Sequence, residues 1–282
     1  RSKSDAQVAE AVIKTEIERI SQKKIYKPEI RPGTFKYEPP PFIKFQTPTM
    51  REILRKITAS NMVVDHGGRV TMPEWLEKAD IPIGESVYRM GIGGLHSTES
   101  SVARISDDRV TYLDRDVRSF YPSIILLLRL FPKHLGEVFL KVFKRIFDTR
   151  ISAKQRAEAL EAACDMLAAR GFADIAETLK IVLNGSFGKF GSPFSVLSSP
   201  KLMIQTTVTG QLSALMAIES LELRDFRVIS ANTDGFVTRV ERERRDLFNA
   251  VMFDWEIDTG FVTEETEYAA LYSRDVNNYI AI

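Results

Sequence analysis

Cysteine, histidine and long apolar runs are scarce in this sequence of 282 residues. The one cysteine, Cys164, excludes an internal disulfide and any multi-cysteine zinc or iron–sulfur site, and is typical of a reducing cytoplasm. Three scattered histidines leave few soft ligands, so zinc is disfavoured. The longest apolar run, residues 124–128, is far shorter than the roughly 18 residues of a membrane span. We therefore expect a cytoplasmic protein without a membrane partner.

Charge of one sign is not in excess either. Lysine and arginine number 39 and aspartate and glutamate 38, which gives a net charge of +1, so any affinity for nucleic acid must come from local clusters. The apolar content of 44% is enough for about two compact units at roughly 150 residues each. The chain begins Arg-Ser-Lys, without Met or a signal pattern, and we interpret it as a piece of a longer protein.

The order of helix and strand patterns predicts a mixed α+β fold. Residues 5–24 and 49–61 have helical apolar spacing, and the proline-rich segment 28–48 between them is expected to be an extended arm held by its aromatic side chains. The glycines of 91–94 exclude a stable helix there. Further along, we expect a strand at 110–117, helices from about 119, 135 and onward to 184, a long helix at 201–223, a hairpin at 226–240, a helix at 242–253 and closing strands at 266–282.

Two aspartates lie where strands end. Asp116 follows the alternating strand Val-Thr-Tyr-Leu-Asp-Arg and precedes a helix, and Asp234 lies at the tip of the hairpin turn Asn-Thr-Asp-Gly. Taken alone, each has a plain structural explanation, because aspartate caps helices and tolerates tight turns.

A third motif changes this interpretation. Lys180, Asn184 and Phe187 stand at i, i+4 and i+7, and so share one helical face, while Ile181, Val182 and Leu183 lie off it. A cation, an amide and a ring in a row can hold a phosphate and lie against a base pair.

These three motifs together resemble those of family B DNA polymerases, especially the phage and prophage branch. Residues 116–125, Asp-Val-Arg-Ser-Phe-Tyr-Pro-Ser-Ile-Ile, resemble the first palm motif, with Phe120 in place of Leu. Residues 180–188 resemble the fingers motif, with Gly185 for Ser and Phe187 for Tyr. Residues 232–235 are similar to the Asp-Thr-Asp-Ser turn, with Asn232 first and Gly235 last. The resemblance extends over residues 85–282.

The resemblance implies template-directed transfer of a nucleotide from a dNTP to a primer 3′-hydroxyl, with primer–template DNA as partner. It implies an α+β fold, a palm of antiparallel sheet backed by helices with a short helical fingers subdomain. The expected boundaries are a connector at 1–100, palm at 101–133, fingers at 134–192 and palm again at 193–282. The exonuclease and thumb parts are expected to be missing.

The resemblance also implies residue roles. Tyr121 is similar to the family's steric gate against a 2′-hydroxyl, and Arg150 with Lys154 resembles its triphosphate-binding Arg-x-x-x-Lys. The nucleotide-binding residues implied are Val117, Ser119, Phe120, Tyr121, Arg150, Lys154, Lys180, Asn184 and Phe187. The backbone amides of residues 117–120 are expected to face phosphate. The DNA-binding residues implied are Gly93, Gly94, Gly188, Thr233, Asn278 and Tyr279.

Charge on the reacting phosphates calls for two Mg²⁺ ions, for which Mn²⁺ is a possible substitute. Mg²⁺ takes one or two carboxylates together with phosphate oxygens, and Asp116 and Asp234 meet that need if their strands are neighbours, with the Val117 carbonyl as a further ligand. Asn232 brings no charge, so we expect it to be auxiliary. Two other hypotheses stay open: a degenerate palm that binds DNA or a protein without catalysis, and, less consistent with the fingers motif, a metal-dependent nucleotidyl cyclase.

Overall fold

The computed structural model describes residues 4–282, which form two compact units, each assembled from separate stretches of chain. Unit 1 contains residues up to 33, 64–70 and 121–203. Unit 2 contains residues 34–63, 71–120 and 204–282.

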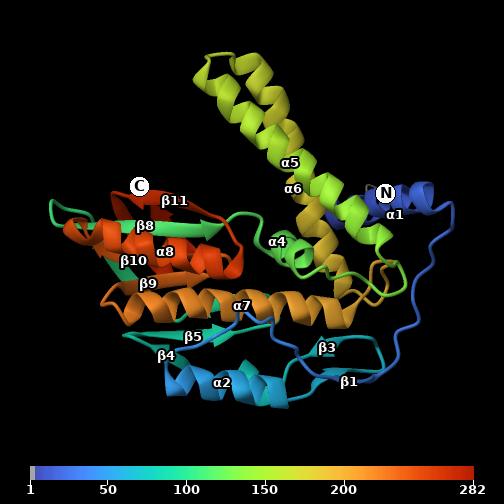
Figure 1. Cartoon of the computed structure of the whole chain (residues 1–282), viewed down its shortest axis with the longest axis horizontal. Helices are drawn as coiled ribbons and strands as arrows, with labels where there is room; N and C mark the ends of the chain where they lie inside the picture. Colours follow the sequence, from blue (N-terminus) through green and yellow to red (C-terminus); the bar gives the residue numbers. More distant parts are fainter. Residues whose placement is uncertain (1–3) are drawn as a thin grey trace. The chain divides into compact units, whose positions relative to one another are not determined.

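Unit 2 is built on a seven-stranded sheet in the order β11, β8, β10, β9, β6, β5, β4, in which every pair of neighbours is antiparallel (Figure 1). From edge to edge the strands span Thr263–Tyr268, Val110–Val117, Gly235–Glu241, Arg227–Asn232, Leu95–Ser97, Ser86–Met90 and Ile81–Ile83. The expected strand at 110–117 and the hairpin at 226–240 are both confirmed.

Two smaller sheets complete the strand content. Strands β13, β12 and β7 form one in that order, spanning Asn278–Ala281, Ala270–Asp275 and Ser100–Ile105. Strands β1, β2 and β3 form the other, spanning Gly33–Phe35, Met62–Val64 and Val70–Thr71.

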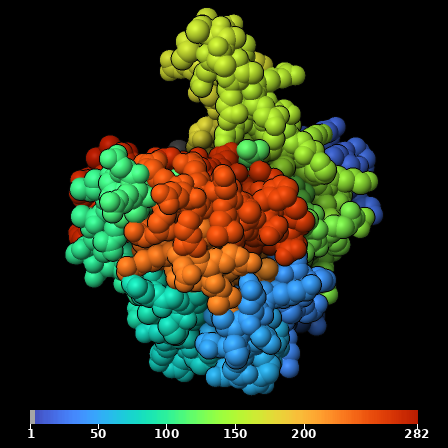
Figure 2. Space-filling view, turned by 60° about the vertical axis from the view of Figure 1, so that its left-hand side comes forward, coloured from blue at the N-terminus to red at the C-terminus, as the bar shows by residue number. Residues whose placement is uncertain are grey.

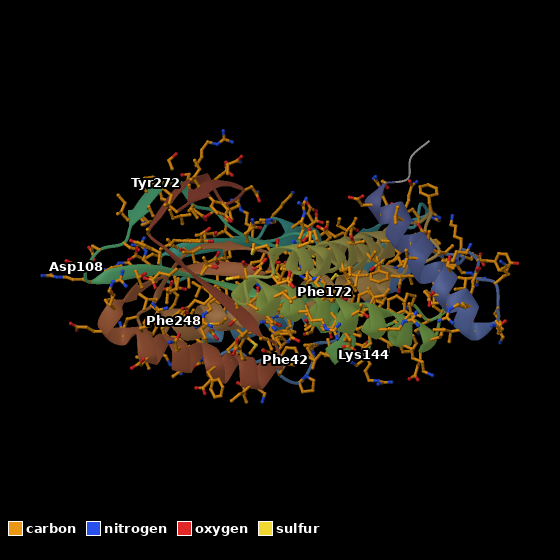
Figure 3. The ribbon with its side chains drawn as sticks, turned by 90° about the horizontal axis from the view of Figure 1, so that it is seen from above. Phe42, Asp108, Lys144, Phe172, Phe248 and Tyr272 are labelled. Carbon is orange, nitrogen blue, oxygen red and sulfur yellow. The ribbon has the colours of Figure 1, made fainter. Side chains whose placement is uncertain are left out.

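Helices pack on the main sheet of unit 2. The helices and the 3-10 turn η1 span Pro48–Ala59 (α2), Glu74–Glu77 (α3), Pro200–Glu222 (α7, of which 200–203 belong to unit 1), Arg242–Arg244 (η1) and Arg245–Thr259 (α8). The Arg115 guanidinium of β8 donates to Asn249 of α8 at 2.8 Å and lies 5.4 Å from the ring of Phe248, labelled in Figure 3. Successive strand residues point to opposite faces, so α8 covers the face of β8 that Asp116 does not use. The outer side of α8, orange-red in Figure 2, is at the surface.

The proline-rich segment 28–48 is mostly extended, as expected, and its second half packs within unit 2. Tyr37 is 2% exposed and its hydroxyl is 2.9 Å from that of Thr209 on α7, while Phe45 is 7% exposed. Burial of these rings holds the arm in place, which confirms the expectation of an ordered arm rather than a free linker.

Unit 1 is helical. Its helices are α1 (Asp5–Ser21), α4 (Phe120–Leu127, of which Phe120 belongs to unit 2), α5 (Val138–Ala162) and α6 (Met166–Phe190). Helices α5 and α6 lie side by side as a hairpin (Figure 1), and Asp165 caps α6 by accepting a hydrogen bond from the Ala168 amide at 3.2 Å. The fully buried rings of Phe139, Phe143 and Phe190 form the centre of its core.

Helix α6 differs from the expectation that helices end near Asn184, because it runs through two glycines to Phe190. A glycine costs a helix about 1 kcal/mol, and burial of Leu183 and Phe190 in the core offsets that cost. The expected α+β class, an antiparallel sheet backed by helices, is confirmed. Within residues 4–282 no helix is both long and apolar enough to span a membrane.

Candidate functional site

Asp116 and Asp234 meet in the unit 2 sheet where strand β8 ends and strand β10 begins. Strands β8 and β10 are direct neighbours, and Asp116 is paired in register with Gly235, the residue after Asp234. The Val117 amide donates to the Asp234 carbonyl oxygen at 2.8 Å, which ties the end of β8 to the β9–β10 turn. The condition set by the sequence, that the two strands be neighbours in one sheet, is therefore met.

Gly235 is required by the Asp116 side chain. A Cβ atom added to Gly235 would lie 1.9 Å from Oδ1 of Asp116, far inside van der Waals contact. The Asp116 carboxylate thus rests directly on the backbone of the neighbouring strand. The absence of a side chain at position 235, where the family pattern has Ser, follows from this close approach.

A small cavity of about 210 Å³ opens between these residues. Its polar lining includes Asp114, Asp116, Asn232, Asp234 and Tyr279. Asp114 was missed by the sequence reasoning, although its position two residues before Asp116 on an alternating strand places both on the same face. Asp114 is 9% exposed, and its Oδ2 accepts a hydrogen bond from the Tyr268 hydroxyl.

The cavity raises the pKa values of Asp114 and Asp116. Asp116 lies at the exposed mouth, yet partial desolvation, and then the charges of Asp114 and Glu264, raise its pKa to about 6. Burial is also the main reason that the pKa of Asp114 is raised, with the charge of Asp234 adding to it. Negative charge is therefore concentrated here, and a cation would relieve it.

The turn that carries Asp234 is held by several polar contacts. Thr233 has a left-handed backbone with φ of 56°, and its amide donates to the Leu95 carbonyl at 2.7 Å. Gly94 lies against the same turn, because a Cβ atom added there would be 2.4 Å from Oγ1 of Thr233. Gly94 therefore has a structural reason to be glycine, and contact of Gly93, Gly94 and Thr233 with DNA stays a prediction.

Asn232 uses its carboxamide inside the protein. Its Nδ2 donates to the Val276 carbonyl and to Oδ1 of Asn277, both at 3.4 Å, and its Oδ1 accepts from the Thr233 hydroxyl at 3.2 Å. These contacts hold the segment after β12 beside the hairpin turn.

The predicted primer-contacting residues divide in two. Tyr279 of β13 reaches the cavity while 50% exposed, and burial together with the charges of Asp114, Asp116 and Asp234 raises its pKa. The Asn278 side chain is used locally, since its Nδ2 donates to Asp275 at 2.8 Å. Of this pair, Tyr279 is the residue that faces the carboxylates.

One part of the expected phosphate contact is wrong. The Val117 amide donates to Asp234, and the Arg118 amide donates to the Val262 carbonyl at 2.9 Å, so neither amide is open to a phosphate. The reason is that the backbone at the end of β8 stays paired on both sides, with Asp234 in the β9–β10 turn and with Val262 just before β11. The Phe120 ring is 4% exposed and packs edge-on against Phe261, so its side chain is part of the core.

Ser119 belongs to unit 2 and has a left-handed backbone with φ of 49°, and the predicted nucleotide-binding residues from Tyr121 onward belong to unit 1. On α6, Lys180 and Asn184 are exposed, and Lys180 pairs with Glu177 at 3.5 Å. Phe187, one turn further, stacks on the Tyr121 ring with centroids 4.2 Å apart and planes 26° apart. The structure therefore brings the predicted sugar-contacting ring and the predicted base-contacting ring into direct contact.

Arg150 and Lys154 are half-buried on α5, and Lys154 pairs with Glu158 at 3.8 Å. They lie on the opposite face of the helix from an open hollow of about 590 Å³ lined by Lys141, Lys144, Arg145, Arg156 and Phe172, among others. Figure 3 labels Lys144 and Phe172 beside this hollow. Two basic faces thus exist on one helix, and the sequence motif belongs to only one of them.

Gly185 and Gly188 of α6 have different surroundings. A Cβ atom on Gly185 would lie 3.1 Å from Cβ of Ala9 and 3.2 Å from Cα of Ala6, so glycine lets α1 cross α6 closely. Packing of α1 thereby explains why glycine stands at position 185. Gly188 is exposed with open space around it, and its contact with DNA stays a prediction.

The donor set of the cavity fits a hard divalent cation. Carboxylate oxygens are the ligands that Mg²⁺ and Mn²⁺ prefer. No three or more His, Cys, Asp or Glu side chains between residues 4 and 282 form a preformed metal cluster. Mg²⁺ sites in phosphoryl-transfer proteins take one or two carboxylates and complete their shell with water and substrate phosphates. Two carboxylates at the ends of two adjacent strands suit that type of site.

Fold and site together define an α+β protein whose antiparallel sheet carries a carboxylate-lined cavity at the end of two adjacent strands. No protein-family model and no curated protein matches the sequence. Among solved structures, the family B DNA polymerase from the hyperthermophilic archaeon Pyrobaculum calidifontis is similar, with a TM-score of 0.45 and 15% sequence identity. The similarity covers 65% of this chain and 28% of that polymerase chain.

Proposed function

We propose that the chain is the palm and fingers portion of a template-directed DNA polymerase. The observation that carries the proposal is the meeting of Asp116 and Asp234, which are far apart in sequence, on adjacent strands around one cavity. Three motifs resemble those of family B polymerases and occur in the same order along the chain. This resemblance supports the interpretation of the two carboxylates as ligands of catalytic metal ions. In the proposed reaction the primer 3′-hydroxyl attacks the α-phosphate of a dNTP, and pyrophosphate leaves.

Each group of residues has a role in this proposal. Asp116 and Asp234 would hold two Mg²⁺ ions, or Mn²⁺, which neutralise charge on the reacting phosphates. Arg150, Lys154 and Lys180 would bind the β- and γ-phosphates. Tyr121 would lie under the sugar. The remaining proposed contacts with nucleotide or DNA are Ser119, Asn184, Phe187, Gly93, Gly94, Gly188, Thr233, Asn278 and Tyr279.

Primer extension with the full chain tests the proposal. A primed DNA template, the four dNTPs and Mg²⁺ should give extension that Asp116→Asn and Asp234→Asn each abolish. Asn232→Ala should only reduce extension, because this position brings no charge. Asp108→Asn is the matched control, since Asp108 is an exposed aspartate before β8, labelled in Figure 3, that does not line the cavity.

Asn232 favours a second candidate, a palm that binds DNA without catalysis. Loss of one carboxylate would weaken cation binding, and the Asn232 side chain is used for internal hydrogen bonds. Binding of primer–template DNA by the parent protein without any nucleotide incorporation would support this candidate and contradict the polymerase proposal.

A further inference from the structure

Asn232 stands where the similar family turn has its first aspartate, and in this chain its side chain makes hydrogen bonds within the protein. The Asn232 amide donates two hydrogen bonds to the segment at Val276 and Asn277. A carboxylate cannot donate, so aspartate at this position could not make both contacts. The cavity therefore has one negative charge fewer at the hairpin turn than the motif would provide.

A negative charge of the same kind is present on the neighbouring strand. Asp114 and Asp116 are two residues apart on β8 and share a face, and both line the cavity with Asp234. The Asp114 side chain is nearly buried, and its hydrogen bond comes from the neutral Tyr268 hydroxyl rather than from a cation. Burying a carboxylate without a cationic partner costs free energy, which a bound cation would recover.

Asp114 does not complete a preformed three-ligand cluster in the described part of the chain. Its contribution would therefore be negative charge in the cavity that it lines together with Asp116 and Asp234. The Tyr268 hydroxyl fixes the orientation of that charge.

We propose that Asp114 supplies the carboxylate charge that Asn232 lacks, and that Tyr268 positions it toward divalent cations bound by Asp116 and Asp234. This inference rests on the proposed function. It predicts that a carboxylate at position 232 can replace the carboxylate at position 114 in supporting the same cation site.

Mn²⁺ binding to the full chain, followed by the electron paramagnetic resonance of free Mn²⁺, tests this replacement without relying on activity. Asp114→Asn should weaken Mn²⁺ binding by on the order of tenfold, the loss found when groups that support metal ligands are removed. Adding Asn232→Asp to that variant should restore most of the affinity. Tyr268→Phe, which keeps Asp114 but removes its positioning hydroxyl, should weaken binding by a smaller factor.

The controls separate this inference from the function on which it rests. Asp116→Asn must remove Mn²⁺ binding; if it does not, the proposed function itself fails. If Asp116→Asn removes binding but Asp114→Asn leaves it unchanged, only the role of Asp114 is overturned. If Asn232→Asp restores nothing in the Asp114→Asn protein, the replacement is overturned. Melting curves should show that Asp114→Asn melts no lower than the parent, because the substitution removes repulsion within the cavity.

Discussion

At the residue scale, two glycines stand where the family motifs have Ser, and each has its own steric reason. Gly185 admits α1 against α6, and Gly235 admits the Asp116 carboxylate against β10. Both changes are therefore consequences of close packing in this chain. They also show which neighbours would move if a side chain were returned.

The first prediction concerns Gly235→Ala. The added methyl would occupy the space of Asp116 Oδ1, so the carboxylate must rotate away from its position against the backbone of Gly235. Misplacing a reactive group by about 1 Å can cost on the order of 100-fold in rate, and we expect a loss of that size in primer extension. Gly171→Ala on α6, where the added atom meets open space, is the control that should keep full activity. Equal activity of the two variants would contradict the described position of Asp116.

A second prediction concerns pH. Because the pKa of Asp116 is raised to about 6, its carboxylate becomes protonated as the pH falls through this value. Mn²⁺ affinity should therefore drop between pH 7 and pH 5, and the midpoint should move lower as Mn²⁺ is added, since the cation binds only the ionised form. A flat affinity over this range would contradict the assignment of Asp116 as a ligand.

The raised pKa of Asp116 also makes the stability of the folded protein depend on pH. In the folded protein the ionised form of Asp116 is disfavoured, so its cost is present above pH 6 and is relieved as the pH falls toward the ordinary value near 3.8. Asp116→Asn should accordingly raise the melting temperature more at pH 8 than at pH 5. Asp108→Asn, on the exposed turn before β8, should show no such difference.

At the scale of elements, features set by local sequence patterns could be predicted, whereas features set by long-range contacts could not. The strand at 110–117 and the hairpin turn of Asn-Thr-Asp-Gly were predictable because alternation and turn chemistry are local. Asp114 was missed because a polar residue within a strand is expected from the ordinary alternation of polar and apolar side chains. Only the neighbouring strands show that it lines a cavity. The amides of Val117 and Arg118 were misjudged because their acceptors, at Asp234 and Val262, are more than a hundred residues away.

Glu219 is another long-range contact that the sequence could not reveal. This α7 residue is 1% exposed, and its carboxylate accepts hydrogen bonds from the Gln46 amide at 2.7 Å, the Thr47 amide at 2.9 Å and the Thr47 hydroxyl at 2.6 Å. It therefore binds the start of α2, where unpaired amides and the helix dipole favour negative charge.

A further prediction is that Glu219→Ala lowers the free energy of unfolding by about 1–3 kcal/mol, because partly buried amides lose their acceptor. Denaturant titration of the full chain measures the change. Glu219→Gln keeps one acceptor oxygen and should cost less. Glu77→Ala, an exposed residue at the end of α3, should change stability little. A loss at Glu219 no larger than at Glu77 would contradict its role in holding α2.

At the scale of the whole molecule, the residues of the proposed function are divided between the two compact units. Segment 116–125 is itself divided, because Asp116 belongs to unit 2 and Tyr121 to unit 1. The carboxylates are all in unit 2, whereas Arg150, Lys154 and Lys180 are all in unit 1. Cation binding and triphosphate binding should therefore be separable by mutation.

The last prediction is that Arg150→Ala with Lys154→Ala raises the apparent KM for dNTP by on the order of tenfold or more, since each lost contact to a charged group costs about 1.5–3 kcal/mol. Mn²⁺ binding should not change, because Arg150 and Lys154 belong to unit 1 and the carboxylates of the cavity belong to unit 2. Lys141→Ala with Lys144→Ala is the matched control, with the same loss of charge from the opposite face of α5, beside the hollow. If both double variants raised KM equally, the effect would come from general charge rather than from the motif. If the Arg150 and Lys154 variant also lost Mn²⁺, the separation of the two tasks between units would be wrong.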